Sequence, residues 1–280
     1  MTIVVAVAAP DGMVLVADSR STQFEDRHHR IASDSAVKVF SIGDRVGVAT
    51  YGASVIDHQT IAGVMDEFAT TLEKPKDLGG LTSRMRSKIA TENFEVSYIA
   101  KRLGKFFDER LENAQEEFEP DEIALAFLVA GYDADGIGRI IEIELPGAYD
   151  SELATTSSKG IAYRGQSDVA DRLLAGVDGV LLSALGVEIP DDVDVALRQL
   201  AYRHMYPLSM QDAIDFASFL VRTTIDMQRF SDGTVAVPKG IPGCGGPMRV
   251  LAINRQQTTW IADPTLTVVA RAGIAEGAYS

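Results

Sequence analysis

The sequence predicts an α+β protein in which two antiparallel sheets lie between two layers of helices, a four-layer αββα sandwich. Apolar stretches typical of strands occur near the start, the middle and the end of the chain, and two stretches with helical periodicity separate them. No Pro-rich or Ser-rich linker and no internal repeat divides the chain. We therefore expect residues 1–280 to form a single domain, which is long enough for a sizeable core.

The strand predictions rest on apolar runs that are bounded by turn residues. Residues 3–9 are apolar without alternation, which is typical of a strand buried on both faces. Asp11 and Gly12 form a hairpin signal that leads into a second apolar strand at 13–17. The other expected strands cover residues 36–41, 46–50, 124–132, 139–145, 248–254 and 258–261.

The helix predictions rest on apolar residues spaced three and four positions apart. The first helical stretch covers residues 55–119, with one apolar stripe at 56–68 and a longer one within 81–118. Further helices are expected from about Ser167, over 193–205, and after Ser209, a residue type that often caps a helix N-terminus.

Composition excludes several classes of function. A net charge of −14 opposes binding to nucleic acid or to an anionic membrane, and no apolar run approaches the ~18 residues that span a bilayer. The first residues lack the basic segment of a signal peptide, and a single cysteine fits a reducing compartment, so we expect a cytoplasmic protein. The four histidines show no metal-ligand spacing, and we expect neither a metal nor another cofactor.

Thr2 is the most informative single residue. Removal of Met1 would leave Thr2 with a free α-amino group beside its own hydroxyl, which places a base and a nucleophile in one residue. A small second residue is common in proteins that have no such chemistry, so Thr2 alone predicts little.

Three more positions near the N-terminus could carry chemistry, and each is also compatible with a purely structural role. Asp18 and Arg20 follow the second strand, where they would ordinarily indicate a structural ion pair. Lys38 stands in an apolar stretch, so it either faces solvent or, if buried, must be paired. Gly52 stands at an expected junction of strand and helix, where a backbone N–H and the helix N-terminus can stabilise negative charge, although an ordinary turn would account for it equally well.

Together, Thr2, Asp18, Arg20, Lys38 and Gly52 resemble the β-subunits of the proteasome, which are N-terminal nucleophile (Ntn) hydrolases. The spacing from Lys38 to Gly52 agrees with that family without a gap, and the stretch between Arg20 and Lys38 is slightly longer. The resemblance extends over roughly the whole chain through residues 128–133, 206–214, 245–250 and Trp260.

The resemblance implies a catalytic mechanism. Thr2 attacks an amide carbonyl through its hydroxyl, and its α-amino group or a nearby water takes the proton. Lys38 either lowers the pKa of that hydroxyl or shuttles the proton, with Asp18 as its ionic partner, and the N–H of Gly52 stabilises the oxyanion. Arg20 holds the loop around Asp18.

The resemblance also implies a substrate site and support for the α-amino group. Ser21 and Thr22 line the edge where an extended peptide adds as a strand, and Thr50 contributes to the first specificity pocket. Ser167 is expected to supply a hydroxyl near the amine, and Asp226 is the expected counterpart of a family aspartate. The family's Ser-Gly-Gly is replaced here, because a cysteine, expected to be a small residue in a tight turn, stands at 244.

The predicted function is therefore hydrolysis of peptide bonds by a threonine-type protease inside a self-compartmentalised homo-oligomer. The implied partners are further copies of the chain in a ring or another assembly, peptide or unfolded protein substrates, and a separate ATPase unfoldase. An Ntn amidohydrolase acting on a small non-protein amide and a non-catalytic assembly subunit remain as alternatives. Only Met1 precedes Thr2 in the sequence, so its removal is expected to suffice for activation.

Overall fold

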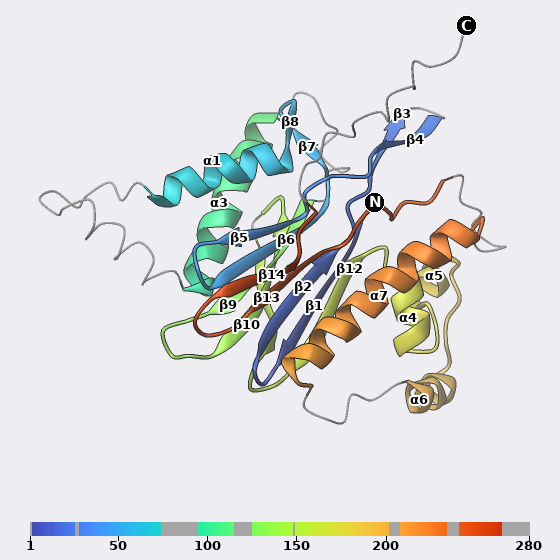
Figure 1. Ribbon diagram of the computed structural model, residues 1–280. Coiled ribbons are helices and arrows are strands. Elements are labelled where there is room, and N and C mark those ends of the chain that lie inside the picture. The colour runs from blue at the N-terminus through green and yellow to red at the C-terminus, as the bar shows by residue number, and fades with distance from the viewer. Residues whose placement is uncertain are drawn as a thin grey trace, which may run out of the picture.

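The computed structural model describes residues 2–25, 28–73, 95–114, 125–147, 149–201, 208–233 and 241–264. Figure 1 shows two stacked sheets between two helical layers, which confirms the predicted αββα sandwich. One helical layer contains α1 (Ile61–Glu73) and α3 (Val96–Ala114), and the other contains α4 (Asp168–Leu174) and α7 (Met210–Phe230).

Both main sheets are antiparallel and have five strands each in the described part of the chain. The first has the order β12 (Gly160–Gly165), β1 (Ile3–Ala9), β2 (Gly12–Ala17), β13 (Arg249–Ile253), β14 (Thr258–Ala262). The second has the order β11 (Tyr149–Thr155), β10 (Gly138–Leu145), β9 (Leu125–Tyr132), β6 (Val46–Gly52), β5 (Val39–Ile42). The smaller elements are the hairpins β3 (Ser21–Glu25) with β4 (His28–Ser33) and β7 (Val55–Ile56) with β8 (Gln59–Thr60), and the helices α5 (Gly179–Ala184) and α6 (Asp191–Leu200).

The prediction that residues 3–9 form a strand buried on both faces is confirmed. Successive side chains of a strand point to opposite faces, so Val4 and Ala6 pack between the two sheets while Val5 and Val7 pack against the helical layer of α7. All seven residues of β1 are buried. A strand with two apolar interfaces needs no polar side and therefore shows no alternation.

Helix α7 begins where the sequence predicts. The Ser209 side chain accepts a hydrogen bond from the backbone N–H of Asp212, and the Asp212 carboxylate accepts one from the backbone N–H of Ser209, which forms a capping box. A buried stripe then follows the helix through Ala213, Ala217, Leu220, Thr224 and Gln228. The last two members are polar: the Thr224 hydroxyl donates to the carbonyl of Leu220 in the same helix, and the Gln228 side chain bonds Gln166 and Cys244.

Several element predictions need correction. The strand expected at 36–41 begins only at Val39. The helix expected over 193–205 is observed as α6, which begins at Asp191 and ends at Leu200, and residues 202–205 lie outside the described part. The loop expected between Arg20 and Lys38 contains the β3–β4 hairpin, and β11, β12 and α5 lie in stretches for which no element was predicted. Of the helix expected within 81–118, Val96–Ala114 is observed, and residues 81–94 and 115–118 lie outside the described part.

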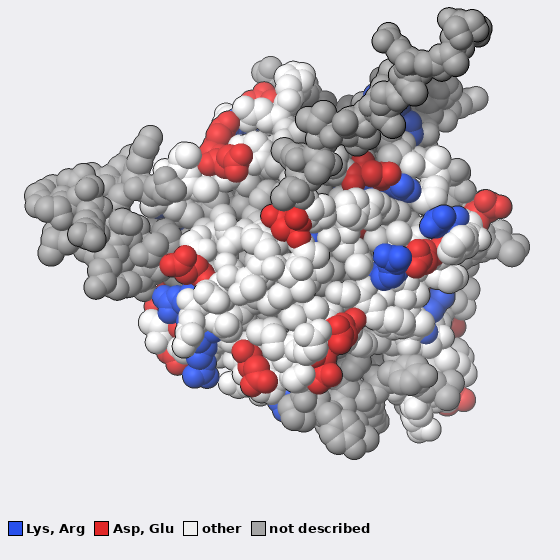
Figure 2. Space-filling view, viewed as in Figure 1, with Lys and Arg blue, Asp and Glu red and all other residues white. Residues whose placement is uncertain are grey.

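The described surface carries charged side chains of both signs. On the face shown in Figure 2, acidic and basic side chains are interspersed, and the basic ones form no continuous patch. None of the helices in the described ranges is long and apolar enough to cross a bilayer.

Candidate active site

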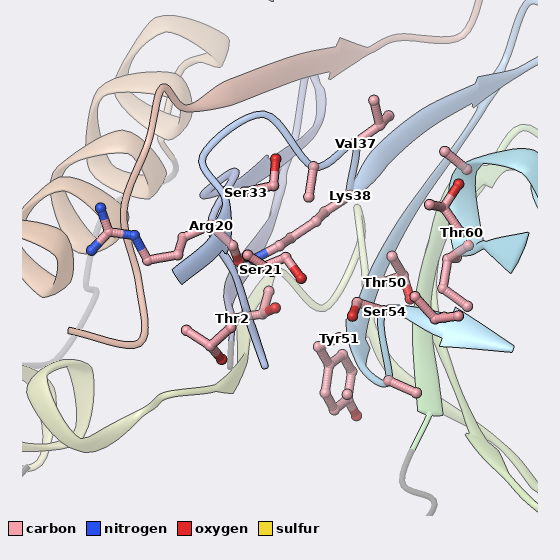
Figure 3. Close-up of a pocket in the computed structure, with 18 of the residues that line it drawn as sticks. Thr2, Arg20, Ser21, Ser33, Val37, Lys38, Thr50, Tyr51, Ser54 and Thr60 are labelled. Atoms are coloured by element: carbon pink, nitrogen blue, oxygen red, sulfur yellow. The ribbon is translucent and has the colours of Figure 1, made fainter. Parts of the chain in front are cut away.

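A cavity of about 510 Å³ opens where β1 begins and β6 ends. Figure 3 shows that its walls come from the start of β1, the β3–β4 hairpin, the segment before β5, the end of β6 and the start of α1. The cavity brings together seven of the residues predicted from the sequence: Thr2, Arg20, Ser21, Thr22, Lys38, Thr50 and Gly52.

Thr2 is fixed by the register of β1 against β12. Residues two apart in a strand share a face, so the Thr2 side chain lies on the same face as Val4, toward the second sheet. The backbone N–H of Gln166 donates to the Thr2 carbonyl at 2.7 Å. Gly165 has a φ of +85°, and a Cβ on it would lie 2.0 Å from the Thr2 carbonyl oxygen, so this close approach requires glycine.

Lys38 and Asp18 form a buried ion pair beside Thr2. The Lys38 Nζ donates to Asp18 Oδ1 at 2.7 Å and to the carbonyl of Arg20 at 2.5 Å. The Asp18 side chain has no exposed surface, and it also accepts backbone N–H bonds from Ile3, Arg20 and Gly245. A buried ammonium requires such a partner, so the expectation of a paired Lys38 is confirmed and a solvent-facing lysine is excluded.

Arg20 makes a different ion pair from the one expected for an isolated Asp-Ser-Arg segment. Its guanidinium binds both carboxylate oxygens of Asp34, at 2.6 and 2.9 Å, and donates to the carbonyl of Pro242. The hydrogen bond to Asp34 raises the pKa of Arg20, and burial opposes the shift only in part. Arg20 also lies against Gly245, the residue that donates to Asp18. Arg20 therefore contacts the loop that holds Asp18. The prediction of an ion pair between Arg20 and Asp18 is wrong, because Arg20 pairs with Asp34 instead.

Gly52 ends β6 with a φ of +96°, which favours glycine. The N–H of Thr50 donates to the carbonyl of Lys38 on the β5 side of the strand. N–H groups two residues apart in a strand point the same way, so the N–H of Gly52 points to the side of the Lys38 segment, where the cavity lies. The expected helix N-terminus at Gly52 is wrong, because β7 and β8 intervene and α1 begins only at Ile61.

The predicted substrate residues occupy two walls of the cavity. Ser21 and Thr22 come from β3, and Thr50 comes from β6. The Thr50 hydroxyl donates to the carbonyl of Ala126 at 3.3 Å, which fixes its rotamer.

Ser167 and Asp226 do not lie at the cavity. The Ser167 hydroxyl donates to Asp171 at 2.8 Å at the start of α4. Asp226 pairs with Arg222 one turn earlier on α7, and its side chain is 40% exposed. Neither Ser167 nor Asp226 is among the described residues that line the cavity.

A chain of neutral groups connects α7 with the backbone of Thr2. The Gln228 side-chain amide donates to the Gln166 side chain at 3.0 Å, and its oxygen accepts the backbone N–H of Cys244 at 2.8 Å. Gln166 in turn holds the Thr2 carbonyl through its own N–H. Gln228 follows Leu220 and Thr224 at helical spacing. Its position as a polar residue in this stripe could have predicted that it is buried and hydrogen-bonded.

Cys244 is a small buried residue in a glycine turn, as expected. Its side chain is almost completely inaccessible, and burial raises the pKa of its thiol. A thiol without a low pKa or access to substrate is a poor nucleophile.

A second buried carboxylate near the cavity is absent from the predictions. Glu142 of β10 accepts the hydroxyl of Tyr51 at 2.6 Å and two guanidinium N–H groups of Arg164, one of them at 2.9 Å. Burial would raise the pKa of Glu142, but the hydrogen bonds from Arg164 and Tyr51 outweigh it and lower that pKa. The stretch Ile140–Leu145 contains two glutamates among apolar residues, and as for Lys38 the sequence leaves open whether each faces solvent or is buried and paired; Glu142 is buried and Glu144 is exposed.

The described residues contain no group of three or more His, Cys, Asp and Glu side chains that could hold a metal ion. The polar groups at the cavity are hydroxyls, the Lys38 ammonium, the Arg20 guanidinium and backbone N–H and carbonyl groups.

The model of the proteasome subunit family matches residues 2–164, more than half of the chain. The chain belongs to the proteasome subunit family. Its membership supports a proteasome-type hydrolase, and proteasome subunits generally assemble into oligomers. No curated protein sequence matches the chain.

Two solved structures show the same fold as this proteasome-family chain. The Gly-1 mutant of Anbu from Hyphomicrobium sp. strain MC1 matches with a TM-score of 0.56 and 14% identity, covering 94% of this chain and 86% of that one. A second structure of Anbu from the same organism matches with a TM-score of 0.53 and 14% identity, covering 93% and 85%. At this identity the likeness concerns the fold alone.

Proposed function

We propose that the chain is a threonine-type peptidase whose nucleophile is Thr2, exposed at the N-terminus when Met1 is removed. The observation that carries the proposal is the position of Thr2 in one cavity with the Lys38–Asp18 ion pair and with Gly52. A scaffold subunit does not require these groups as a set, and a buried ion pair is weak evidence of a purely stabilising role.

The cavity supports acyl transfer in two steps. The Thr2 hydroxyl oxygen attacks the amide carbon and its proton passes to the free α-amino group, while the Lys38 ammonium stabilises the developing alkoxide. The Gly52 N–H stabilises the oxyanion. The ammonium of Thr2 then protonates the leaving amine as the C–N bond breaks, and water hydrolyses the ester on Thr2 to release the acid and regenerate the hydroxyl.

The walls of the cavity favour an uncharged side chain in the substrate. Apolar and hydroxyl-bearing residues line it, and its two cations, Arg20 and Lys38, are both paired with carboxylates outside the lining. No Asp or Glu is among the described residues that line it. We propose that an extended peptide lies along β3 and inserts a small or apolar side chain next to Thr50, since strand addition leaves alternate side chains free to enter pockets.

A peptide library tests this function. Wild type, Thr2→Ala and Thr2→Ser are purified, and intact mass confirms the loss of Met1 in each. We expect turnover by wild type, residual turnover by Thr2→Ser, which keeps a hydroxyl, and none by Thr2→Ala. Equal turnover by wild type and Thr2→Ala would refute the assignment, and turnover of small amides alone would favour the amidohydrolase.

We further propose that the active form is a homo-oligomer that encloses the cavities and receives unfolded protein from a separate ATPase. Light scattering of the purified chain gives its mass, and a monomeric mass for the active species would contradict the proposal.

A further inference from the structure

Glu142 lies between the two sheets, close to the end of the sandwich that holds Thr2. It shares the inner face of β10 with Ile140, which belongs to the core between the sheets. Its side chain is 6% exposed. A carboxylate at such a place costs stability unless several donors satisfy it, and Glu142 has three hydrogen bonds from two residues.

The two partners of Glu142 come from different sheets. Tyr51 belongs to β6 and therefore to the same sheet as Glu142, whereas Arg164 belongs to β12 and to the other sheet. The Arg164 guanidinium binds both oxygens of Glu142, and this bidentate geometry fixes direction as well as distance. The carboxylate thus links the two sheets through side chains whose positions are set by hydrogen bonds.

Each partner is next to a backbone segment of the proposed reaction centre. Tyr51 precedes Gly52, whose N–H is the proposed oxyanion donor, and it lines the cavity itself. Arg164 precedes Gly165, which approaches the Thr2 carbonyl so closely that no Cβ fits. One carboxylate therefore connects the strand that carries the oxyanion donor with the strand that holds the nucleophile.

We propose that Glu142 is a positioning residue, which sets the separation between Thr2 and the N–H of Gly52 through Arg164 and Tyr51. The inference rests on the proposed function and adds to it the group that aligns the two halves of the site across the sheets. An error of about 1 Å in such an alignment can reduce a rate by about 10²-fold.

The protonation states of Glu142 and Tyr51 are stable around neutral pH. Hydrogen bonds lower the pKa of Glu142 against the effect of burial, and burial together with the bond to Glu142 raises the pKa of Tyr51. Glu142 therefore stays an acceptor and Tyr51 a donor under the conditions of an assay.

The test uses Glu142→Gln, which keeps the shape and removes the charge, and Tyr51→Phe, which keeps the ring and removes one hydrogen bond. The matched control is Asp178→Asn. Asp178 is similarly buried and pairs with a half-exposed arginine, Arg172, at 3.2 Å, but this pair anchors the start of α5 and does not line the cavity.

Four quantities are measured on Met1-free protein: kcat and KM for the best peptide of the library, the rate of covalent labelling by a peptidyl epoxyketone, and the melting temperature. Epoxyketone capture needs the hydroxyl and the amine of Thr2 in the correct geometry. We expect Glu142→Gln to lower kcat and the labelling rate by about 10–100-fold with KM changed less than about threefold. Tyr51→Phe should give a smaller loss, and Asp178→Asn should lower only the melting temperature.

A purely structural role would look different. If Glu142→Gln melts earlier, as Asp178→Asn does, but keeps the wild-type kcat and labelling rate, the inference is wrong. If Glu142→Gln does not fold, a folded Tyr51→Phe with unchanged kcat and labelling rate overturns it. These outcomes differ from a failure of the proposed function, in which Thr2→Ala keeps full turnover.

Discussion

The Lys38–Asp18 ion pair gives a test that needs no substrate. Lys38→Met replaces the buried ammonium by an apolar side chain and leaves the Asp18 carboxylate without its cation. Breaking a buried pair costs about 3–5 kcal/mol. Three backbone N–H groups still bind Asp18, so we expect a loss near the lower end, about 3 kcal/mol. For a domain of this size, 1 kcal/mol corresponds to about 2–4 °C in Tm, which predicts a fall of roughly 6–12 °C.

A double-mutant cycle supplies the decisive measurement. Urea unfolding followed by circular dichroism gives the free energies of unfolding for Lys38→Met, Asp18→Asn and the double variant. The second substitution removes the uncompensated charge, so the double variant should lose at least about 1 kcal/mol less than the sum of the two. Additive losses would refute the reasoning. Lys105→Met is the matched control, because its pair with Glu109 is 79% and 61% exposed, and it should change stability by less than about 0.5 kcal/mol.

Three further predictions concern the groups behind the cavity. Gln228→Leu leaves the buried N–H of Cys244 without an acceptor and should cost about 1–3 kcal/mol in urea unfolding, whereas Gln211→Leu on the same helix removes only an exposed hydrogen bond to Asp215 and should change stability by less than about 0.5 kcal/mol; equal losses would contradict the role of the Gln228 amide. Burial raises the pKa of the Cys244 thiol, so iodoacetamide at about pH 8 should alkylate it in urea but not in the native protein, and rapid native alkylation would speak against that burial. Burial would raise the pKa of Glu142, but the hydrogen bonds from Arg164 and Tyr51 outweigh it and lower that pKa. The ionic contribution of Glu142 to stability is therefore present above the ordinary pKa of a glutamate and is lost as the pH falls through the lowered pKa of the folded state. The difference in Tm between wild type and Glu142→Gln should shrink as the pH falls through that lowered pKa, and a difference that stays constant down to strongly acidic pH would disprove this.

The strands that hold the site could be predicted because their burial removes any polar alternation. Residues 3–9 pack against apolar side chains on both faces, and an apolar run too short to span a membrane is typical of a strand inside a core. The β3–β4 hairpin was missed for the opposite reason. Its sequence, Ser21 to Ser33, mixes polar, charged and apolar residues without a regular period, and Ser21 is half-buried, Thr22 buried and Gln23 exposed.

The exposed position of Asp226 follows from helix geometry. Leu220, Thr224 and Gln228 are spaced by four and lie on the buried face of α7. Asp226 is two residues from Gln228, which turns it by about 200° around the helix, and it pairs with Arg222 at the exposed side. The residue type of Asp226 matches the family, whereas the periodicity of the helix predicts on which face each side chain lies.

The two buried acids near the cavity, Asp18 and Glu142, show which part of a polar contact can be predicted from the sequence. Asp18 follows an apolar strand and Glu142 stands inside one, so each needs donors if it is buried. Glu144 of the same strand is exposed, so the strand pattern alone does not show which acid is buried. The sequence also does not show which donors each acid finds, because Asp18 finds Lys38 and Gly245 while Glu142 finds Arg164 from the other sheet. Those choices depend on strand register and on how the sheets stack. A buried charge at an apolar strand therefore connects segments that are far apart in the sequence. Asp18 connects the end of β2 with Lys38 and Gly245, and Glu142 connects β10 with β12, the neighbour of β1 in the other sheet.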